Sequence, residues 1–269
     1  MMKKRVLKAF KAYTDHYDIS NVNIRLKIDH TYRVAAIAEQ IAKSVGLGEY
    51  NVGFCWLLGM LHDIGRFEQY TRFGTFKDAE SLDHAELGAN ILFNDGLITS
   101  FIDPEEWNDP DGIDYDGWDE MRPMAEVAIR MHNKLTLPET LDEGERFYAE
   151  LLRDSDKCDI MRVLTEPPYD ERNARIVEGS KDGGMLAASE DIMNCVYQHR
   201  CVPKSYARTD FENLISQCCM GFELVFPKSR EIVKRQGYLA ELMNLNVKDK
   251  MMAQQLAILR NEMEKAWKE

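Results

Sequence analysis

An apolar run that begins near Tyr50 ends in the doublet His62-Asp63. Its length and apolar content are those of a buried helix, and Gly53 and Gly59 within it indicate close packing against another helix. Buried polar groups are costly without partners, and imidazole and carboxylate are both metal ligands. The run therefore predicts a buried helix that ends at a metal site.

The rest of the chain is dominated by helical periodicity, and we find no convincing series of alternating strands. In the first part of the chain the pattern predicts an amphipathic N-terminal helix and helices over 20–46, 50–63, 83–92, 121–134 and 142–165. In the last part it predicts helices over about 170–179, 186–199, 209–225, 228–243 and 248–267. Residues 65–81 lack clear periodicity and are predicted to form a loop. The fold class is therefore all-α.

Two features suggest how the chain is organised. Residues 95–119 are rich in acidic residues, proline and glycine, which predicts a long loop or insertion of the kind that serves as a lid or is disordered. Pro167-Pro168 and Gly183-Gly184 mark a seam farther along. We expect a helical domain over 1–169 that contains the acidic insertion, and a helical extension over 170–269 that packs on this core or continues it.

Composition excludes several classes of function. The chain has 269 residues, of which 45% are hydrophobic and 30% charged, as in a soluble globular protein. Its net charge of −12 argues against general binding to long nucleic acid or to an anionic membrane. No stretch reaches the ~18 apolar residues of a membrane span, and Lys8 and Lys11 interrupt the apolar segment that a signal peptide would need. The cysteines form no Cys-x-x-Cys pair and no regular framework, which argues against a zinc-thiolate site. Such cysteine usage favours a reducing cytoplasm as the compartment.

Histidine is scarce in this chain, and its positions are ordered. Four of the six histidines and two aspartates occur in the order His, His-Asp, His, His, Asp. Each position alone has an ordinary explanation, such as a hydrogen-bonded core histidine or a polar helix end. All of them fall on helices or helix ends that must pack into one bundle, so together they favour a shared metal site. The candidate ligands are His30, His62, Asp63, His84, His132 and Asp156.

The residues around these positions resemble the HD-domain superfamily of metal-dependent phosphohydrolases. The resemblance covers about 20–165 and is carried by Asp29–Val34, Leu58–Arg66 and Ser155–Lys157. It implies an HD-type helical bundle in which His30, His62, Asp63 and Asp156 bind one divalent metal. Family members with two further histidines hold a second metal, and His84 and His132 match those positions. The resemblance thus implies two divalent ions bridged by Asp63, and the donor set suits Fe, Mn, Zn, Co or Ni without choosing among them.

The resemblance also implies an activity, namely hydrolysis of a phosphate ester or anhydride by metal-activated hydroxide. The expected substrate is a small phosphorylated molecule, of which a nucleotide is one candidate. Asp63, Arg66 and Lys157 are the expected catalytic residues. The candidates for binding the substrate's phosphate are Arg33, Arg66, Lys134 and Lys157, because each is close in sequence to a ligand.

Two other functions fit the same residues. A minority of similar proteins use this ligand set to hold two irons and oxidise a polyol or a phosphonate with O₂. A third reading is a non-catalytic nucleotide-sensing module whose C-terminal helices bind a partner. Association of identical chains also stays open, since the sequence does not decide the oligomeric state.

Overall fold

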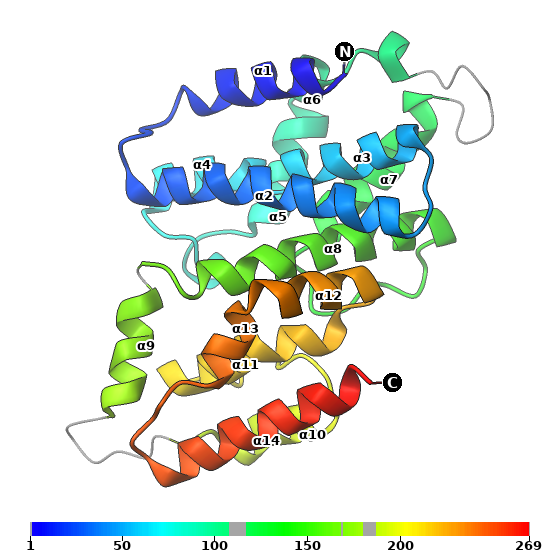
Figure 1. The fold of residues 1–269 in the computed structure, drawn as a ribbon. Helices are drawn as coiled ribbons and strands as arrows, with labels where there is room; N and C mark the ends of the chain where they lie inside the picture. Colours follow the sequence, from blue (N-terminus) through cyan, green and yellow to red (C-terminus); the bar gives the residue numbers. More distant parts are fainter. Residues whose placement is uncertain (1, 108–116, 168, 180–186, 269) are drawn as a thin grey trace. The chain divides into compact units, whose positions relative to one another are not determined.

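The computed structural model describes residues 2–107, 117–167, 169–179 and 187–268 (Figure 1). All regular elements within these ranges are helical, which confirms the all-α prediction. The chain divides into two compact units, Met1–Asp156 and Lys157–Glu269. The division falls inside the long helix α8 (Glu143–Val163), so the expected domain boundary near residue 169 stays a prediction.

The first unit carries the helices that supply the candidate ligands. The described helices of this unit, of which α1 and α6 supply no ligand, are α1 (Met2–Thr14), α2 (Val22–Ser44), α3 (Glu49–Leu61), α4 (Ile64–Phe73), α5 (His84–Ala89), α6 (Ile98–Phe101), α7 (Trp118–Met131) and the start of α8. Short 3₁₀ turns occupy Asp78–Glu80 and Pro104–Trp107, and a π-helical turn at Asn90–Asn94 continues α5.

Helices α2 and α3 form a hairpin at the centre of this unit. The Asn21 side chain caps α2 by accepting a hydrogen bond from the Asn23 amide. The helices pack so closely that a Cβ atom on Gly59 would lie 2.5 Å from the Ala35 Cα. The close packing expected from the glycines is therefore confirmed at Gly59. At Gly53 a Cβ would instead meet only the flexible end of the Met2 side chain.

The predicted loop over 65–81 was wrong, because α4 occupies Ile64–Phe73. Ile64 and Phe67 give this helix a short apolar face that the polar Glu68 and Thr71 interrupt, and the fully buried Gln69 lies on the opposite side. The Gln69 amide donates hydrogen bonds to the segment that follows α4, including the Leu82 carbonyl. Polar residues on the apolar face, and a buried polar residue on the other side, removed the periodic signal. Gly74, with φ +67°, ends the helix.

The prediction of a long acidic loop or insertion over 95–119 was also wrong in part. Residues 98–101 and 104–107 are helical, and α7 begins at Trp118. Phe101 and Trp107 are buried, and the Trp107 ring packs against Phe54 with a centroid distance of 6.1 Å. Much of the segment thus contributes aromatic side chains to the core, while 108–116 lies outside the described residues.

The second unit contains the end of α8 and six further helices. These are α9 (Tyr169–Glu178), α10 (Glu190–Tyr197), α11 (Asp210–Cys218), α12 (Pro227–Gln236), α13 (Tyr238–Met243) and α14 (Lys250–Ala266). The single helix expected over 228–243 is divided at Gly237, whose φ of +80° interrupts it. The helix expected over 209–225 ends at Cys218 and passes into a 3₁₀ turn.

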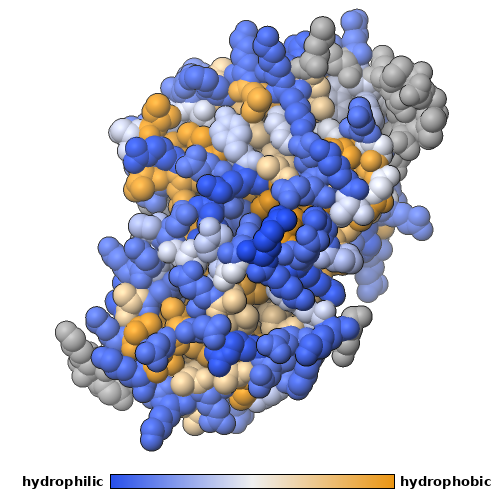
Figure 2. Space-filling view, viewed as in Figure 1, coloured by the Kyte–Doolittle hydropathy of each residue, from blue (hydrophilic) through white to orange (hydrophobic). Residues whose placement is uncertain are grey.

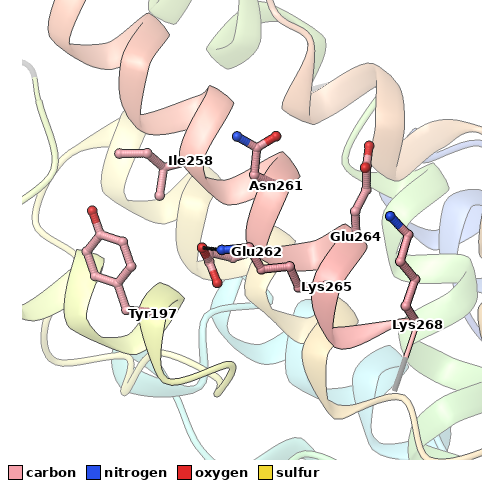
Figure 3. A pocket seen from close by; sticks show the side chains of 7 residues that line it. All are labelled: Tyr197, Ile258, Asn261, Glu262, Glu264, Lys265 and Lys268. Carbon is pink, nitrogen blue, oxygen red and sulfur yellow. Dashed lines mark hydrogen bonds and ion pairs between the residues drawn. The ribbon is translucent and has the colours of Figure 1, made fainter.

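A surface cavity of about 340 Å³ lies between α10 and α14 (Figure 3). Tyr197 lines it from α10, and Glu262 and Lys265 of α14 form an ion pair of 2.6 Å at its edge. None of its lining residues is a candidate ligand. Hydrophilic side chains cover most of the face in Figure 2, with apolar patches scattered among them. Across the described part of the chain, no helix is long and apolar enough to cross a bilayer.

Candidate metal centre

The six candidate ligands come from six different helices or helix ends of the first unit. His30 lies within α2 and Asp156 within α8, His62 follows the last residue of α3, and Asp63 precedes α4. His84 opens α5 and His132 follows α7. All six side chains are buried or nearly so, with Asp156 the most exposed at 13% of its side chain. The structure therefore brings together every ligand that the sequence predicted.

The approach of α4 to α5 places Asp63 beside His84. A Cβ on Gly65 would lie 2.2 Å from the His84 carbonyl oxygen and 2.6 Å from the Gly88 amide nitrogen. Only glycine permits this contact, because any side chain there would force the two backbones apart. Asp83 fixes the start of α5, since its side chain accepts hydrogen bonds from the Ala85 and Glu86 amides.

The two carboxylate oxygens of Asp63 face different pairs of histidines. Oδ2 lies 3.6 Å from Nε2 of His30 and 3.5 Å from Nε2 of His62. Oδ1 lies 3.6 Å from Nε2 of His84 and 3.8 Å from Nε2 of His132. Asp63 thus stands between two sets of nitrogen donors, as a bridging carboxylate would.

Asp156 completes the set around the first pair of histidines. Its Oδ1 lies 3.0 Å from Nε2 of His30 and 3.7 Å from Nε2 of His62. The ligand atoms of His30, His62 and Asp63 lie within 4.8 Å of one another, and the same holds for Asp63, His84 and His132. Groups of this size and composition are able to hold a divalent ion.

Hydrogen bonds to the far ring nitrogens show which nitrogens carry lone pairs. Nδ1 of His62 lies 2.8 Å from the Gly59 carbonyl oxygen, and Nδ1 of His132 lies 2.7 Å from that of Ile129. A carbonyl only accepts, so each Nδ1 carries the proton and each Nε2 carries a lone pair. Nδ1 of His84 is held in the same way by the Asp78 carboxylate at 2.9 Å. Such bonds are typical of histidines that bind a metal through the other nitrogen.

The Nε2 lone pairs of His84 and His132 converge at short range. The Nε2 atoms of His84 and His132 are 3.0 Å apart, and those of His30 and His62 are 3.4 Å apart. With the proton of His84 and of His132 on Nδ1, no hydrogen atom is available to join their Nε2 atoms. Two lone pairs in this position repel each other unless a cation lies between the donors. The donor set therefore fits divalent metal ions.

The protonation states also suit metal binding. Burial, helped by the neighbouring His132 and His30, lowers the pKa of His62 to about 4 against the opposing charges of Asp63 and Asp156. Burial and the charge of Arg66 lower the pKa of His84 to about 3. Both imidazoles are therefore neutral at pH 7, the form that binds a metal without first releasing a proton.

The carboxylates are held in the charged form. Burial acts to raise the pKa of Asp63, but Lys27, His62 and Arg66 outweigh it and hold that pKa well below the usual range. The pKa of Asp156 is lowered against burial in the same way, chiefly by its hydrogen bond with His30. At neutral pH the centre consequently offers the neutral imidazoles of His62 and His84 together with the charged oxygens of Asp63 and Asp156.

Of the basic residues that the sequence singled out, the structure brings Arg66 to the centre. Its Nε lies 3.5 Å from Oδ1 of Asp63, and its Nη1 donates to Asp78. Lys134 pairs with Asp83, the residue that caps α5. Lys157 forms an ion pair of 2.9 Å with Glu223 in the second unit. Arg33 is exposed on α2, whereas His30 on the same helix is buried.

Sequence reasoning missed two residues of the centre. The Nζ of Lys27 lies 2.7 Å from Oδ2 of Asp63. Lys27 precedes His30 by three positions on α2, and this helical spacing was a signal for a shared face. Asp78, which accepts from His84 and Arg66, lies in the segment taken for a loop and gave no periodic signal.

Comparison with known proteins agrees with this geometry. The family model described as HD domain matches residues 28–161, a range that contains all six candidate ligands. No curated protein and no solved structure matches the chain significantly. The chain is a member of the HD-domain superfamily, with the family's domain at residues 28–161.

Proposed function

We propose that this protein is a metal-dependent phosphohydrolase with two divalent ions bridged by Asp63. The observation that carries the proposal is the position of Asp63, whose Oδ2 faces His30 and His62 while Oδ1 faces His84 and His132. A mononuclear site around His30, His62 and Asp156 would leave His84 as a buried donor without a cation to bind, whereas His132 lies within reach of either set. Two ions held side by side would lower the pKa of a shared water and polarise a phosphoryl oxygen.

The side chains around Asp63 suit a phosphorylated substrate. The buried Nε of Arg66 has no hydrogen-bond acceptor in the described part of the chain, so it is available to a phosphate oxygen. The fork of the guanidinium is held in place because its Nη1 donates to the Phe76 carbonyl and to Asp78. We assign Arg66 the binding of a phosphate oxygen next to the bridged ions, with Lys134 and Lys157 as further candidates.

The substrate class follows from charge. A protein with a net charge of −12 repels long polyanions, whereas a buried cationic centre attracts one small phosphorylated group. We therefore propose a small phosphate ester or anhydride, with nucleotides as the first compounds to try, in a cytoplasmic setting.

Metal content and phosphate release test the proposal together. Protein purified without chelator, with and without oxygen, is expected to hold close to two transition-metal ions per chain. It should release inorganic phosphate from some member of a panel of nucleotides and sugar phosphates when Mn(II) or Co(II) is added without O₂. Iron-dependent O₂ uptake with a polyol or phosphonate, and no phosphate release with any metal, would favour the di-iron oxygenase instead. Tight nucleotide binding without turnover would favour the sensing module.

A matched pair of variants on α8 separates ligand loss from loss of a buried charge. Asp156→Asn removes a carboxylate 3.0 Å from His30, whereas Asp159→Asn removes one that pairs with Arg162 at 2.8 Å. Both residues are buried on the same helix. We expect Asp156→Asn to lower the metal content and Asp159→Asn to leave it unchanged. Equal metal loss in the two variants would count against Asp156 as a ligand.

A further inference from the structure

Lys27 is the closest cationic neighbour of Asp63 that the structure describes. Its Nζ lies 2.7 Å from Oδ2, the oxygen that also faces His30 and His62. Only 14% of the Lys27 side chain and 2% of that of Asp63 are exposed, so the pair is largely removed from water. A buried carboxylate without a counter-charge is strongly destabilising, which explains why an ammonium group occupies this position.

A divalent ion at the same oxygen changes the balance of charge around Lys27. In the metal-free centre Lys27 and Arg66 offset the charge of Asp63. An ion held by His30, His62 and Oδ2 of Asp63 would supply that compensation itself, close to the ammonium group. Like charges at such a distance repel strongly where little water screens them. Lys27 and the metal ion therefore compete for Oδ2.

The surroundings of Lys27 provide a place for the displaced ammonium group. Its Nζ lies over the half-exposed ring of Phe76, 5.6 Å from the centroid, and the guanidinium of Arg66 lies 5.8 Å from the same centroid. The ring holds both cations by cation–π attraction. An ammonium group that leaves Oδ2 thus stays beside Arg66 at the edge of the centre, where a phosphate group would meet both.

We propose that Lys27 is an exchangeable counter-ion, which pairs with Asp63 in the metal-free protein and transfers to the phosphate group of the substrate once divalent ions are bound. The inference rests on the proposed function and adds a residue to it. It makes metal loading and phosphate binding interdependent, because the metal frees the ammonium group that the phosphate then uses.

The decisive experiment measures two affinities of the Lys27→Met variant, which keeps an unbranched apolar side chain beside Phe76 but removes the charge. Metal-stripped full-length protein is titrated with Mn(II), and free Mn(II) is read by electron paramagnetic resonance. The Mn(II)-loaded protein is then titrated calorimetrically with inorganic phosphate. We expect Mn(II) to bind about tenfold more tightly to the variant and phosphate about tenfold more weakly. These opposite signs are the signature of exchange, because a merely structural role would weaken both.

Lys3→Met is the matched control. Lys3 pairs with Glu39 at 2.6 Å and lies over the Trp56 ring at 5.0 Å, the same arrangement away from the centre. It should leave both affinities unchanged. Lys27→Gln, which keeps a hydrogen-bond donor for Asp63, is the second variant should the methionine variant fail to fold, and the same opposite shifts are expected.

Tighter Mn(II) binding without weaker phosphate binding, weaker phosphate binding alone, or weaker binding of both would each overturn the exchange. These results would leave the proposed function intact, provided that the wild type binds two ions and hydrolyses a phosphorylated compound. A wild type that binds no divalent ion would overturn the proposed function itself.

Discussion

Asp63 is the residue whose loss should disturb the centre most, because each of its oxygens serves a different pair of imidazoles. Asp63→Asn keeps the shape but removes the charge that, in the proposed dinuclear site, would bind both ions and assist deprotonation of a shared water. We expect a folded, helical protein with fewer ions at both positions and a loss of at least about a hundredfold in turnover. Metal analysis, circular dichroism and phosphate release check this together. Near wild-type metal content and turnover would show that Asp63 is an ordinary helix end.

Terminal ligands should behave differently from the bridge. His84 faces only Oδ1 of Asp63, so His84→Ala should empty one position more than the other. A titration with Mn(II) should then show one tight ion where the wild type shows two. Loss of both ions, or of neither, would contradict the assignment of His84 to a single position.

The sequence indicated which imidazoles and carboxylates converge better than it indicated which cations lie beside them, for a physical reason. Ligands such as His62 and Asp63 must converge, so their types and order along the chain are constrained together. A lysine or arginine reaches a site through a long flexible side chain, so nearness in sequence says little about its target. Lys157 adjoins Asp156 yet pairs with Glu223, whereas Lys27 reaches Asp63 from another helix.

At the scale of elements, the approach of α4 to α5 holds the bridge in place, and it depends on Gly65. In Gly65→Ala the new methyl group would lie 2.2 Å from the backbone oxygen of His84, which cannot move as a side chain can. We expect a loss of about 1–3 kcal/mol in the free energy of unfolding, as for an overpacked core, together with a lower metal content. Urea denaturation and metal analysis measure the two effects.

Gly53→Ala is the control for this substitution. Its new methyl group would meet the movable end of the Met2 side chain, and alanine favours a helix by about 1 kcal/mol over glycine. The variant should therefore be as stable as the wild type or more so, with its metal content unchanged. Comparable losses in the two variants would mean that the contact between α4 and α5 is not the cause.

Elements were predictable where one face is consistently apolar. The helices α2 and α3 bury long apolar stretches, and the predicted ranges differ from the observed ones mainly at their ends. The prediction of a loop was wrong for α4, in which the polar Gln69 is buried. Its amide donates a hydrogen bond to the Leu82 carbonyl in the segment after the helix. The prediction of a loop was also wrong for Pro104–Trp107. The acidic residues of this segment suggest an exposed loop, but the single buried side chain of Trp107 anchors it to the core.

For the whole molecule, the centre makes stability depend on pH when metal is removed. The pKa of His62 is lowered to about 4 and that of His84 to about 3 in the folded protein. As the pH falls, these imidazoles therefore take up protons in the unfolded chain before they do so in the folded one. Stability is thus greatest above the ordinary pKa of about 6.5 and is lost as the pH falls toward these values. The lowered pKa values of Asp63 and Asp156 act in the same direction in stronger acid.

We expect the melting temperature of chelator-treated protein to fall steadily from about pH 7.5 to about pH 4.5. Protein with bound metal should resist this loss until protons displace the ions. A double variant with His62→Gln and His84→Gln should show a flatter profile without metal. A melting temperature that stays level or rises toward acid in the metal-free wild type would contradict the buried neutral state of these imidazoles.

The rate at which the buried cysteines are alkylated measures how often the protein opens. None of the six is in a disulfide and all are buried, and burial raises the pKa of Cys55 in the first unit and that of Cys218 in the second, the latter to about 12. Alkylating reagents attack thiolates, so neither residue should react while its surroundings stay closed. Pulses of iodoacetamide followed by peptide mass spectrometry would measure the opening rate around Cys55 and around Cys218 separately. Adding Mn(II) should slow the labelling of Cys55. The labelling rate of this thiol would then report metal binding.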